Sequence, residues 1–439
     1  MNYSPDHERT LTARRATQSL GGIFEALFGA NAPVRFSAYD GSSAGDPSAP
    51  IGMHLRTPRG TSYIATAPGS LGLARAYIQG DLEIDGVHPG NPYDALRLIE
   101  QDLHMRRPAP GQALAWARSL GASTLIPPPP PPQEVRPVSK LVKGIRHGRK
   151  RDANAISHHY DVSNRFYELV LGPSMTYTCA CYATEDATLE EAQAHKYDLV
   201  ARKLALEPGM RLLDVGCGWG GMVRHAAKEY GVKVLGVTLS SEQATWAQER
   251  IKDERLDHLA EVRHLDYRDV REGGFDAVSS IGLIEHIGVQ NYPAYFSFLR
   301  GRLRDGGRLL NHGITRPDNQ HAGLPRRGFI GRYVFPDGEL TGSGTIVEAM
   351  EDADLEVQHQ ENLRVHYAKT LIGWCDNLVA NWDEAVAEVG IGTARVWGLY
   401  MAGSRLGFET NQIQLHQILA TRTAEDGASD YPLRHTFGV

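Results

Sequence analysis

A short glycine-rich stretch has the clearest chemical meaning in this sequence. It reads Arg211-Leu-Leu-Asp-Val-Gly-Cys-Gly-Trp-Gly-Gly221, with a strand-like apolar pattern before the glycines and a helical pattern at 222–230 after them. Glycine permits a tight turn and lets a ligand lie against bare backbone. A strand, a glycine loop and a helix in this order build the nucleotide sites of open α/β sheets. The stretch therefore predicts that a nucleotide-like ligand binds at the carboxyl edge of a sheet.

The residues after this loop continue the alternation of strands and helices. Residues 232–238 are mostly apolar, as a buried parallel strand should be, and 243–250 begin a helix. Further strands are expected at 261–268, 275–281 and 307–313. Strands that alternate with helices indicate a doubly wound, mostly parallel sheet of the α/β class.

The first part of the chain has a different pattern. Residues 1–20 are polar, and we expect them to form a flexible N-terminus. Residues 21–122 are expected to form a smaller α+β domain. Within it, 34–39 and 53–57 alternate like short strands, and 69–80 indicate a loop that leads into a short helix.

A proline-rich and basic linker is expected at 123–152, between the first domain and a catalytic domain at 153–439. Six consecutive prolines at 127–132 favour a stiff, extended spacer. Residues 140–151 then carry six Lys or Arg side chains in a protein of net charge −6. This basic segment fits either a solvated linker or attraction to an anionic membrane surface.

The composition excludes several classes of protein. The chain of 439 residues has room for two domains, and its 41% hydrophobic and 22% charged content is ordinary for a globular protein. It has neither an apolar run of membrane-spanning length nor a signal-peptide pattern. Its negative charge argues against non-specific nucleic-acid binding. We expect a cytoplasmic protein without metal, whose four free cysteines lie at 179, 181, 217 and 375.

Several longer motifs carry a resemblance to one family. They lie at 157–167, 175–182, 216–221, 236–243, 266–269, 285–288 and 333–338. With Asp-x-Gly-x-Gly-x-Gly, the first motif of S-adenosylmethionine (SAM) methyltransferases, they make the chain similar to cyclopropane fatty acid synthases and mycolic acid methyltransferases. The N-terminal part resembles the extra domain of the phospholipid-acting members, especially the actinobacterial tuberculostearic-acid branch. The resemblance implies a Rossmann-like class I SAM methyltransferase domain.

The resemblance also implies where SAM binds. Gly216, Gly218 and Gly220 would let the methionine part approach the backbone, and Asp214 would orient this loop, meet the amino group through water, or cap the following turn. The other SAM-binding residues that the family pattern implies are Thr238 and Gln243 near the ribose, Asp266 and Tyr267 at the adenine, and Tyr177 with Thr178.

Methylation of an alkene poses a particular chemical problem. No base is needed to start the reaction, but attack on the sulfonium methyl leaves a carbocation, which must lose one proton in a dry site. The resemblance implies that a bound bicarbonate ion accepts that proton. Its implied ligands are Cys179, Glu285, His312, the backbone of Ile314, and Tyr367. In this set, His and Tyr side chains donate to an anion, and a carboxylate can receive a proton.

The function that the resemblance implies is C-methylation of the double bond in an oleoyl-type phospholipid. The product would be a cyclopropane or a 10-methylene chain, and a separate reductase could saturate the latter. The expected partner is unsaturated phospholipid at the inner face of the membrane, and self-association is left open. Two alternatives remain: a SAM-dependent methyltransferase of another small hydrophobic molecule, and a lipid-binding family member without catalytic activity.

Overall fold

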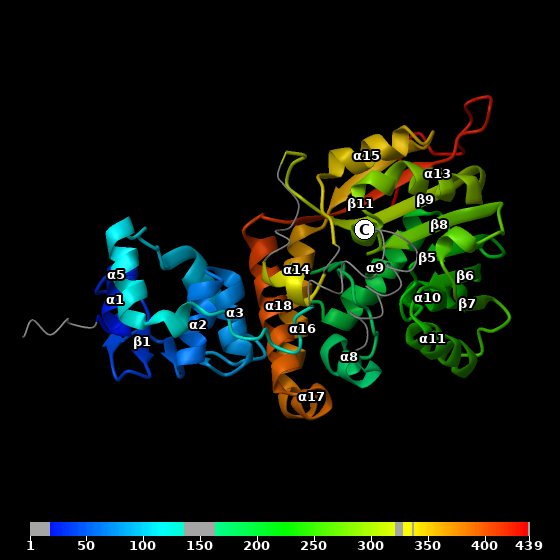
Figure 1. The fold of residues 1–439 in the computed structure, drawn as a ribbon. Coiled ribbons are helices and arrows are strands. Elements are labelled where there is room, and N and C mark those ends of the chain that lie inside the picture. Colours follow the sequence, from blue (N-terminus) through cyan, green and yellow to red (C-terminus); the bar gives the residue numbers. More distant parts are fainter. Residues whose placement is uncertain (1–17, 136–162, 321–327, 336–337, 438–439) are drawn as a thin grey trace, which may run out of the picture. The chain divides into compact units, whose positions relative to one another are not determined.

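The structure is a computed structural model that describes residues 18–135, 163–320, 328–335 and 338–437. The chain divides into two compact units, residues 1–88 with 94–131 and residues 89–93 with 132–439 (Figure 1). The basic segment 140–151 and most of the flexible N-terminus expected at 1–20 lie outside the described residues. Within the described part of the chain, no helix is both long enough and apolar enough to cross a membrane.

The N-terminal unit is a small α+β fold, as predicted. Its four-stranded sheet has the order β2-β1-β3-β4, and buried Val34, Ile51, Met53 and Tyr63 form part of its core. The strands expected at 34–39 and 53–57 correspond to β1 and β3. The elements of this part of the chain are α1 Leu20–Phe28, β1 Arg35–Ala38, β2 Ser43–Ala44, β3 Gly52–Leu55, α2 Pro58–Thr66, α3 Ser70–Ile78, β4 Leu82–Asp85, α4 Tyr93–Arg97, a π-helical turn Leu98–Asp102, α5 Pro110–Leu120 and a 3-10 turn Ala122–Leu125.

The larger unit contains a seven-stranded sheet of order β10-β11-β9-β8-β5-β6-β7. The pairs from β7 to β9 are parallel, and β11 is antiparallel to both of its neighbours. This mostly parallel sheet confirms the predicted Rossmann-like α/β class. Its strands are β5 Arg211–Val215, β6 Lys233–Thr238, β7 Ala260–His264, β8 Phe275–Ile281, β9 Leu303–Thr315, β10 Glu356–Asn362 and β11 Gln414–Thr421.

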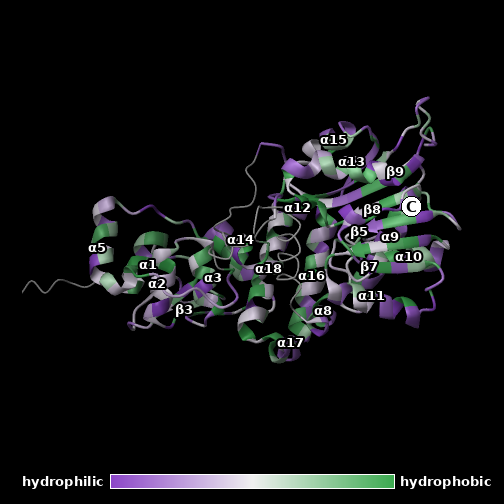
Figure 2. Ribbon diagram, turned by 45° about the vertical axis from the view of Figure 1, so that its right-hand side comes forward, coloured by the Kyte–Doolittle hydropathy of each residue, from purple (hydrophilic) through white to green (hydrophobic). Residues whose placement is uncertain are grey.

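Helices cover both faces of this sheet because successive side chains of a strand point to opposite sides. On β5, Leu212 packs in the cluster that holds α9 and α10, whereas Leu213 packs in the cluster that holds α13 and α15. Figures 1 and 2 show the two helical layers and the hydrophobic strands between them. These helices span α9 Leu189–Lys203, α10 Gly221–Tyr230, α11 Ser241–Asp253, α13 Tyr292–Arg302 and α15 Ser343–Glu351.

The larger unit contains further helices and turns outside these two layers. They are α8 Asn164–Leu171, a 3-10 turn Tyr267–Asp269, α12 Ile284–Ile287, a 3-10 turn Val289–Asn291, α14 Phe329–Tyr333, α16 Arg364–Ala380, α17 Trp382–Val389 and α18 Ile391–Glu409. The third predicted strand was too long. It ends at His264 because the Asp266 side chain accepts a hydrogen bond from the Arg268 amide and starts a 3-10 turn.

The order of the strands fixes where a ligand can bind. Strand β5 lies between β6 and β8, so the connections that leave β5 and β8 run to opposite sides of the sheet. Open α/β sheets bind ligands in the crevice at such a switch point, outside the carboxyl ends of the strands.

Candidate functional site

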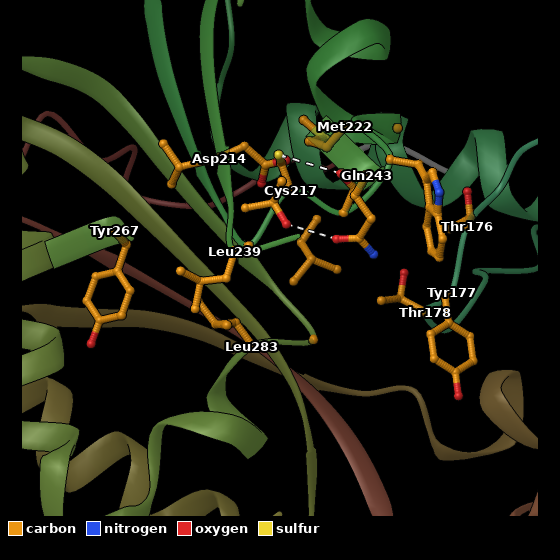
Figure 3. Close-up of a pocket in the computed structure, with 18 of the residues that line it drawn as sticks. Thr176, Tyr177, Thr178, Asp214, Cys217, Met222, Leu239, Gln243, Tyr267 and Leu283 are labelled. Carbon is orange, nitrogen blue, oxygen red and sulfur yellow. Dashed lines mark hydrogen bonds between the residues drawn. The ribbon is translucent and has the colours of Figure 1, made fainter. Parts of the chain in front are cut away.

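A pocket lies at the carboxyl ends of β5, β6 and β8. Figure 3 shows Tyr267 at one end of this pocket and Tyr177 with Thr178 at the other, with Leu239, Gln243 and Leu283 between them. Most of the residues predicted to bind SAM line the pocket: Tyr177, Thr178, Asp214, Gly216, Gly218, Thr238, Gln243 and Tyr267. The predicted residues Gly220 and Asp266 do not line it in the described structure.

The three glycines of the loop have different roles. All have positive φ, at +75° for Gly216, +54° for Gly218 and +74° for Gly220. A Cβ would lie 3.2 Å from Leu283 at Gly216 and 3.1 Å from Ala247 at Gly220, so these two permit close packing. A Cβ at Gly218 would meet no described atom within 4 Å and would point into open space beside the pocket. Gly218 is therefore the glycine whose bare backbone is available to a ligand.

The loop is tied to β6 through its backbone. The amides of Gly216 and Cys217 both donate to the Val237 carbonyl, at 2.9 and 3.0 Å. The Asp214 carboxylate does not cap the turn; it accepts a hydrogen bond of 2.6 Å from the Ser279 hydroxyl on β8. Burial raises the pKa of Asp214 to about 6.

The middle of the pocket is held by a short hydrogen-bonded pair. The Thr238 hydroxyl donates to the side-chain oxygen Oε1 of Gln243 at 2.8 Å. The Ser240 hydroxyl, which caps α11, accepts from the backbone N–H of Gln243. The carboxylate of Asp266, the residue predicted at the adenine, is paired with the Arg268 guanidinium at 2.6 Å. Arg268 itself lines the pocket, so it joins the candidate ligand residues.

Lys196 is a pocket residue that the sequence analysis missed. Its ammonium is fully buried, donates to the Thr178 hydroxyl at 2.8 Å and lies 3.9 Å from the centre of the Tyr197 ring. Burial lowers the pKa of Lys196 to about 8. A signal was present in the sequence, because Lys196 falls on the same helical stripe as Ala192 and Val200, which are both buried.

Aromatic rings connect the pocket with the predicted residue Tyr367. The Tyr177 ring lies 5.4 Å from Trp374 and 5.7 Å from Trp397, and the Trp374 ring lies 6.0 Å from Tyr367. The Tyr177 hydroxyl also donates to the Tyr400 hydroxyl at 3.0 Å. Such rings exclude water, and their faces attract a cation. The tryptophans and Tyr400 were not predicted, because helical aromatic residues at this spacing usually indicate core packing.

Glu285 and His312 are buried beside the end of β8. The Ile314 amide donates to Glu285 Oε1 at 2.6 Å, and the His312 carbonyl accepts from the amide of Gly282, which lines the pocket. Burial raises the pKa of Glu285 to about 7. Burial, together with the charges of Lys196 and Lys203, holds the pKa of His312 well below its usual value.

The other two predicted residues meet at the start of α16. The Cys179 thiol donates to the Ala180 carbonyl at 3.1 Å and lies 3.8 Å from the Leu363 carbonyl. The Tyr367 amide donates to that same Leu363 carbonyl at 3.1 Å. Leu363 in turn donates to Leu415, which pairs with Ile314 across β11 and β9. Backbone hydrogen bonds through strands β11 and β9 thus connect Cys179 and Tyr367 with Glu285.

Two buried polar atoms bear on whether a small anion fits here. Glu285 Oε2 and His312 Nε2 have no hydrogen-bond partner among the described residues. Unpaired buried polar groups are costly, so such atoms commonly mark a bound group. An ion that both donates and accepts hydrogen bonds, as bicarbonate does, suits a carboxylate oxygen and a ring N–H. No group of His, Cys, Asp and Glu in the described structure has the arrangement of a metal site.

Comparisons with known proteins agree with this geometry. The family of mycolic acid cyclopropane synthetases matches residues 147–418. A probable fatty acid methyltransferase of Mycobacterium tuberculosis is 59% identical over 92% of this chain and 94% of its own length. The cyclopropane-fatty-acyl-phospholipid synthase of Escherichia coli K12 is 35% identical over 61% of this chain and 68% of its own length.

Solved structures agree as well. The mycolic acid cyclopropane synthase CmaA1, determined with SAH and CTAB, has a TM-score of 0.58 and 34% identity, and the alignment covers 61% of this chain and 97% of that chain. The fold, the pocket and these matches lead to one conclusion. The chain belongs to the mycolic acid cyclopropane synthetase family and is an enzyme of the SAM-dependent methyltransferase class.

Proposed function

We propose that this enzyme transfers a one-carbon unit from SAM to the double bond of an oleoyl-type acyl chain in a phospholipid. The observation that carries the proposal is the aromatic wall that runs from the pocket at Tyr177 through Trp374 to Tyr367. An alkene needs no base before it attacks, but the resulting cation must be stabilised and kept from water. Rings supply both functions.

The binding residues divide the work. SAM supplies an electrophilic methyl group when it is bound. The bare backbone at Gly218 permits close approach, Thr238 and Gln243 suit the ribose hydroxyls, and Tyr267 presents a ring for the adenine. At the other end, Tyr177 and Thr178 begin the aromatic region where the acyl chain would lie in line with the methyl group.

A bicarbonate ion would supply a mobile proton acceptor. We propose that Cys179, Glu285, His312, the Ile314 amide and Tyr367 hold it. The support is the pair of buried atoms without partners, Glu285 Oε2 and His312 Nε2. A carboxyl with a pKa of about 7 can take up and release a proton near neutral pH.

The choice of a phospholipid substrate rests on the relatives. The M. tuberculosis relative is a probable fatty acid methyltransferase, and the E. coli relative is a cyclopropane-fatty-acyl-phospholipid synthase. Both support acyl chains over another small hydrophobic molecule, the alternative that remains. We place the enzyme in the tuberculostearic-acid branch, where a separate reductase would saturate a methylene product. An intact glycine loop and Glu285 favour catalysis over lipid binding alone.

The product assay tests this function directly. Incubation with SAM and vesicles of dioleoyl phospholipid should add one carbon and two hydrogens to the oleoyl chain, detected by mass spectrometry of the released fatty acids. Cyclopropane and methylene products share this mass and differ in their NMR spectra. Vesicles of saturated phospholipid are the control and should show no change. Methylation of the headgroup, or unchanged oleoyl chains, would contradict the proposal.

We further propose that the basic segment 140–151 brings the enzyme to the membrane. Attraction between exposed charges is screened over about 8 Å at physiological salt, so co-sedimentation with anionic vesicles should fall as salt rises. Neutralising Lys143, Arg146, Arg149, Lys150 and Arg151 should weaken this binding and leave SAM affinity unchanged. Equal vesicle binding by the neutralised variant and the parent would reduce the segment to a spacer.

Replacing Gly218 tests the SAM site. The Cβ of Gly218→Val would meet no described atom within 4 Å, but the side chain would occupy the space beside the pocket, so calorimetry should show a severe loss of SAM affinity. Gly209→Val is the matched control, because Gly209 also has positive φ and open space but does not line the pocket. It should carry a similar backbone strain and keep SAM affinity. Unchanged affinity in a folded Gly218→Val variant would place SAM elsewhere.

Replacing Glu285 tests the proton acceptor. With a pKa of about 7, Glu285 is protonated below that pH and ionised above it, so kcat of the parent should rise as the pH passes through 7. Glu285→Gln should lower kcat by about 10²- to 10⁴-fold, remove this pH dependence and leave SAM affinity intact. Glu339→Gln is a nearby control, because the Glu339 backbone amide donates to the Glu285 carbonyl at 3.0 Å. This variant should keep the kcat of the parent and its pH dependence.

Depletion of bicarbonate separates the ion from the carboxylate. Activity that falls on depletion and returns on addition supports the ion. Activity indifferent to bicarbonate would leave Glu285 itself as the acceptor, and full activity in Glu285→Gln would contradict both.

A further inference from the structure

A row of polar side chains crosses three strands and ends at His312. Glu361 on β10 pairs with Gln417 on β11, which pairs with His312 on β9. Directly paired residues of antiparallel strands project from the same face of the sheet. Lys203, at the end of α9, lies over this face and donates to the Glu361 carboxylate and, at 2.7 Å, to Gln417 Oε1. Gln417 Nε2 lies 3.2 Å from His312 Nδ1.

The direction of each hydrogen bond in this row follows from its first member. A lysine ammonium can only donate, so the Gln417 amide must turn its oxygen to Lys203. The amide nitrogen of Gln417 then faces His312, and it too can only donate. His312 Nδ1 is therefore the acceptor and carries no proton. A neutral imidazole has one N–H, which must then be on Nε2.

The surroundings of His312 keep the ring neutral. Its side chain is buried, and the nearby charges of Lys196 and Lys203 oppose a third positive charge. A doubly protonated ring would also set its Nδ1–H against the N–H of Gln417, so the row itself disfavours protonation. The proton is therefore on Nε2, the ring nitrogen that faces away from the row. The described structure provides no hydrogen-bond partner for this nitrogen.

We propose that Lys203 and Gln417 are positioning residues that hold His312 in its Nε2–H tautomer and make it a hydrogen-bond donor to an anion at the Glu285 site. The identity of that anion rests on the proposed function, but the tautomer is a property of the protein alone. The row also explains why a lysine is buried at position 203, where its side chain is only 1% exposed. Lysine is almost never buried without such partners.

NMR of the unmodified enzyme gives the first test. The enzyme is labelled with ¹⁵N-histidine, and the His312 signals are assigned by their loss in His312→Asn. We expect Nε2 in the protonated range and Nδ1 in the unprotonated range, without added SAM or bicarbonate. A protonated Nδ1 in the parent enzyme would overturn the proposal.

Gln417→Glu gives the second test, because it keeps the shape and the pairing with Lys203 but reverses the last hydrogen bond. A carboxylate only accepts, so His312 Nδ1 should become protonated and Nε2 should lose its proton. Loss of this donor should lower kcat about 10²-fold, the usual effect of removing one anion-binding donor, with SAM affinity unchanged. Gln414→Glu is the matched control, because Gln414 lies on the same strand but bonds to Asn362 and Asn411. It should change neither the His312 tautomer nor kcat.

The outcomes separate this inference from the proposed function. An unprotonated Nδ1 in Gln417→Glu would overturn the positioning role, even in an enzyme that makes the expected lipid product. The predicted tautomer in both proteins, together with failure of the lipid assay, would keep the positioning role and reject the substrate.

Discussion

The burial of Glu285 is the constraint on which the site depends. A carboxyl group removed from water needs hydrogen bonds, and Oε1 of this one accepts a hydrogen bond from the Ile314 amide at 2.6 Å. The amide is in place because β9 continues to Thr315, past the carboxyl end of β8, and β11 pairs with it along that length. The second oxygen of Glu285 and the Nε2 atom of His312 remain without partners in the described structure. The sheet thus builds a polar site that a small ion would complete.

The site suits an unusual division of labour. Methyl transfer to an alkene depends on stabilisation of a cation and exclusion of water more than on a base. The aromatic rings from Tyr177 to Tyr367 can provide both. In the proposed reaction, proton removal comes later and falls to the polar site at Glu285 and His312. Lys196, buried with a pKa of about 8, stands where the two regions meet, because it bonds to Thr178 and its charge acts on His312.

The parts of the structure that could be predicted were those that depend on short segments of sequence. The strand and glycines at 211–221 could be predicted because a run of apolar residues and the positions that need positive φ are properties of short segments. Strands β10 and β11 were missed, and with them the row Lys203–Gln417–His312, because register between distant segments decides which side chains meet. The ion pair between Asp266 and Arg268 was not predicted either, because the motif gives residue types and not side-chain pairings.

We propose that the acceptor at Glu285 takes its proton from the transferred methyl group, and an isotope measurement tests this most directly. The enzyme is given SAM with a fully deuterated methyl group and dioleoyl phospholipid, and the released fatty acids are analysed by mass spectrometry. Ring closure and methylene formation both remove one deuteron from the transferred group, so the account predicts a product that retains two deuterium atoms. A product that retains all three would mean that the proton leaves the acyl chain instead, and would contradict the account.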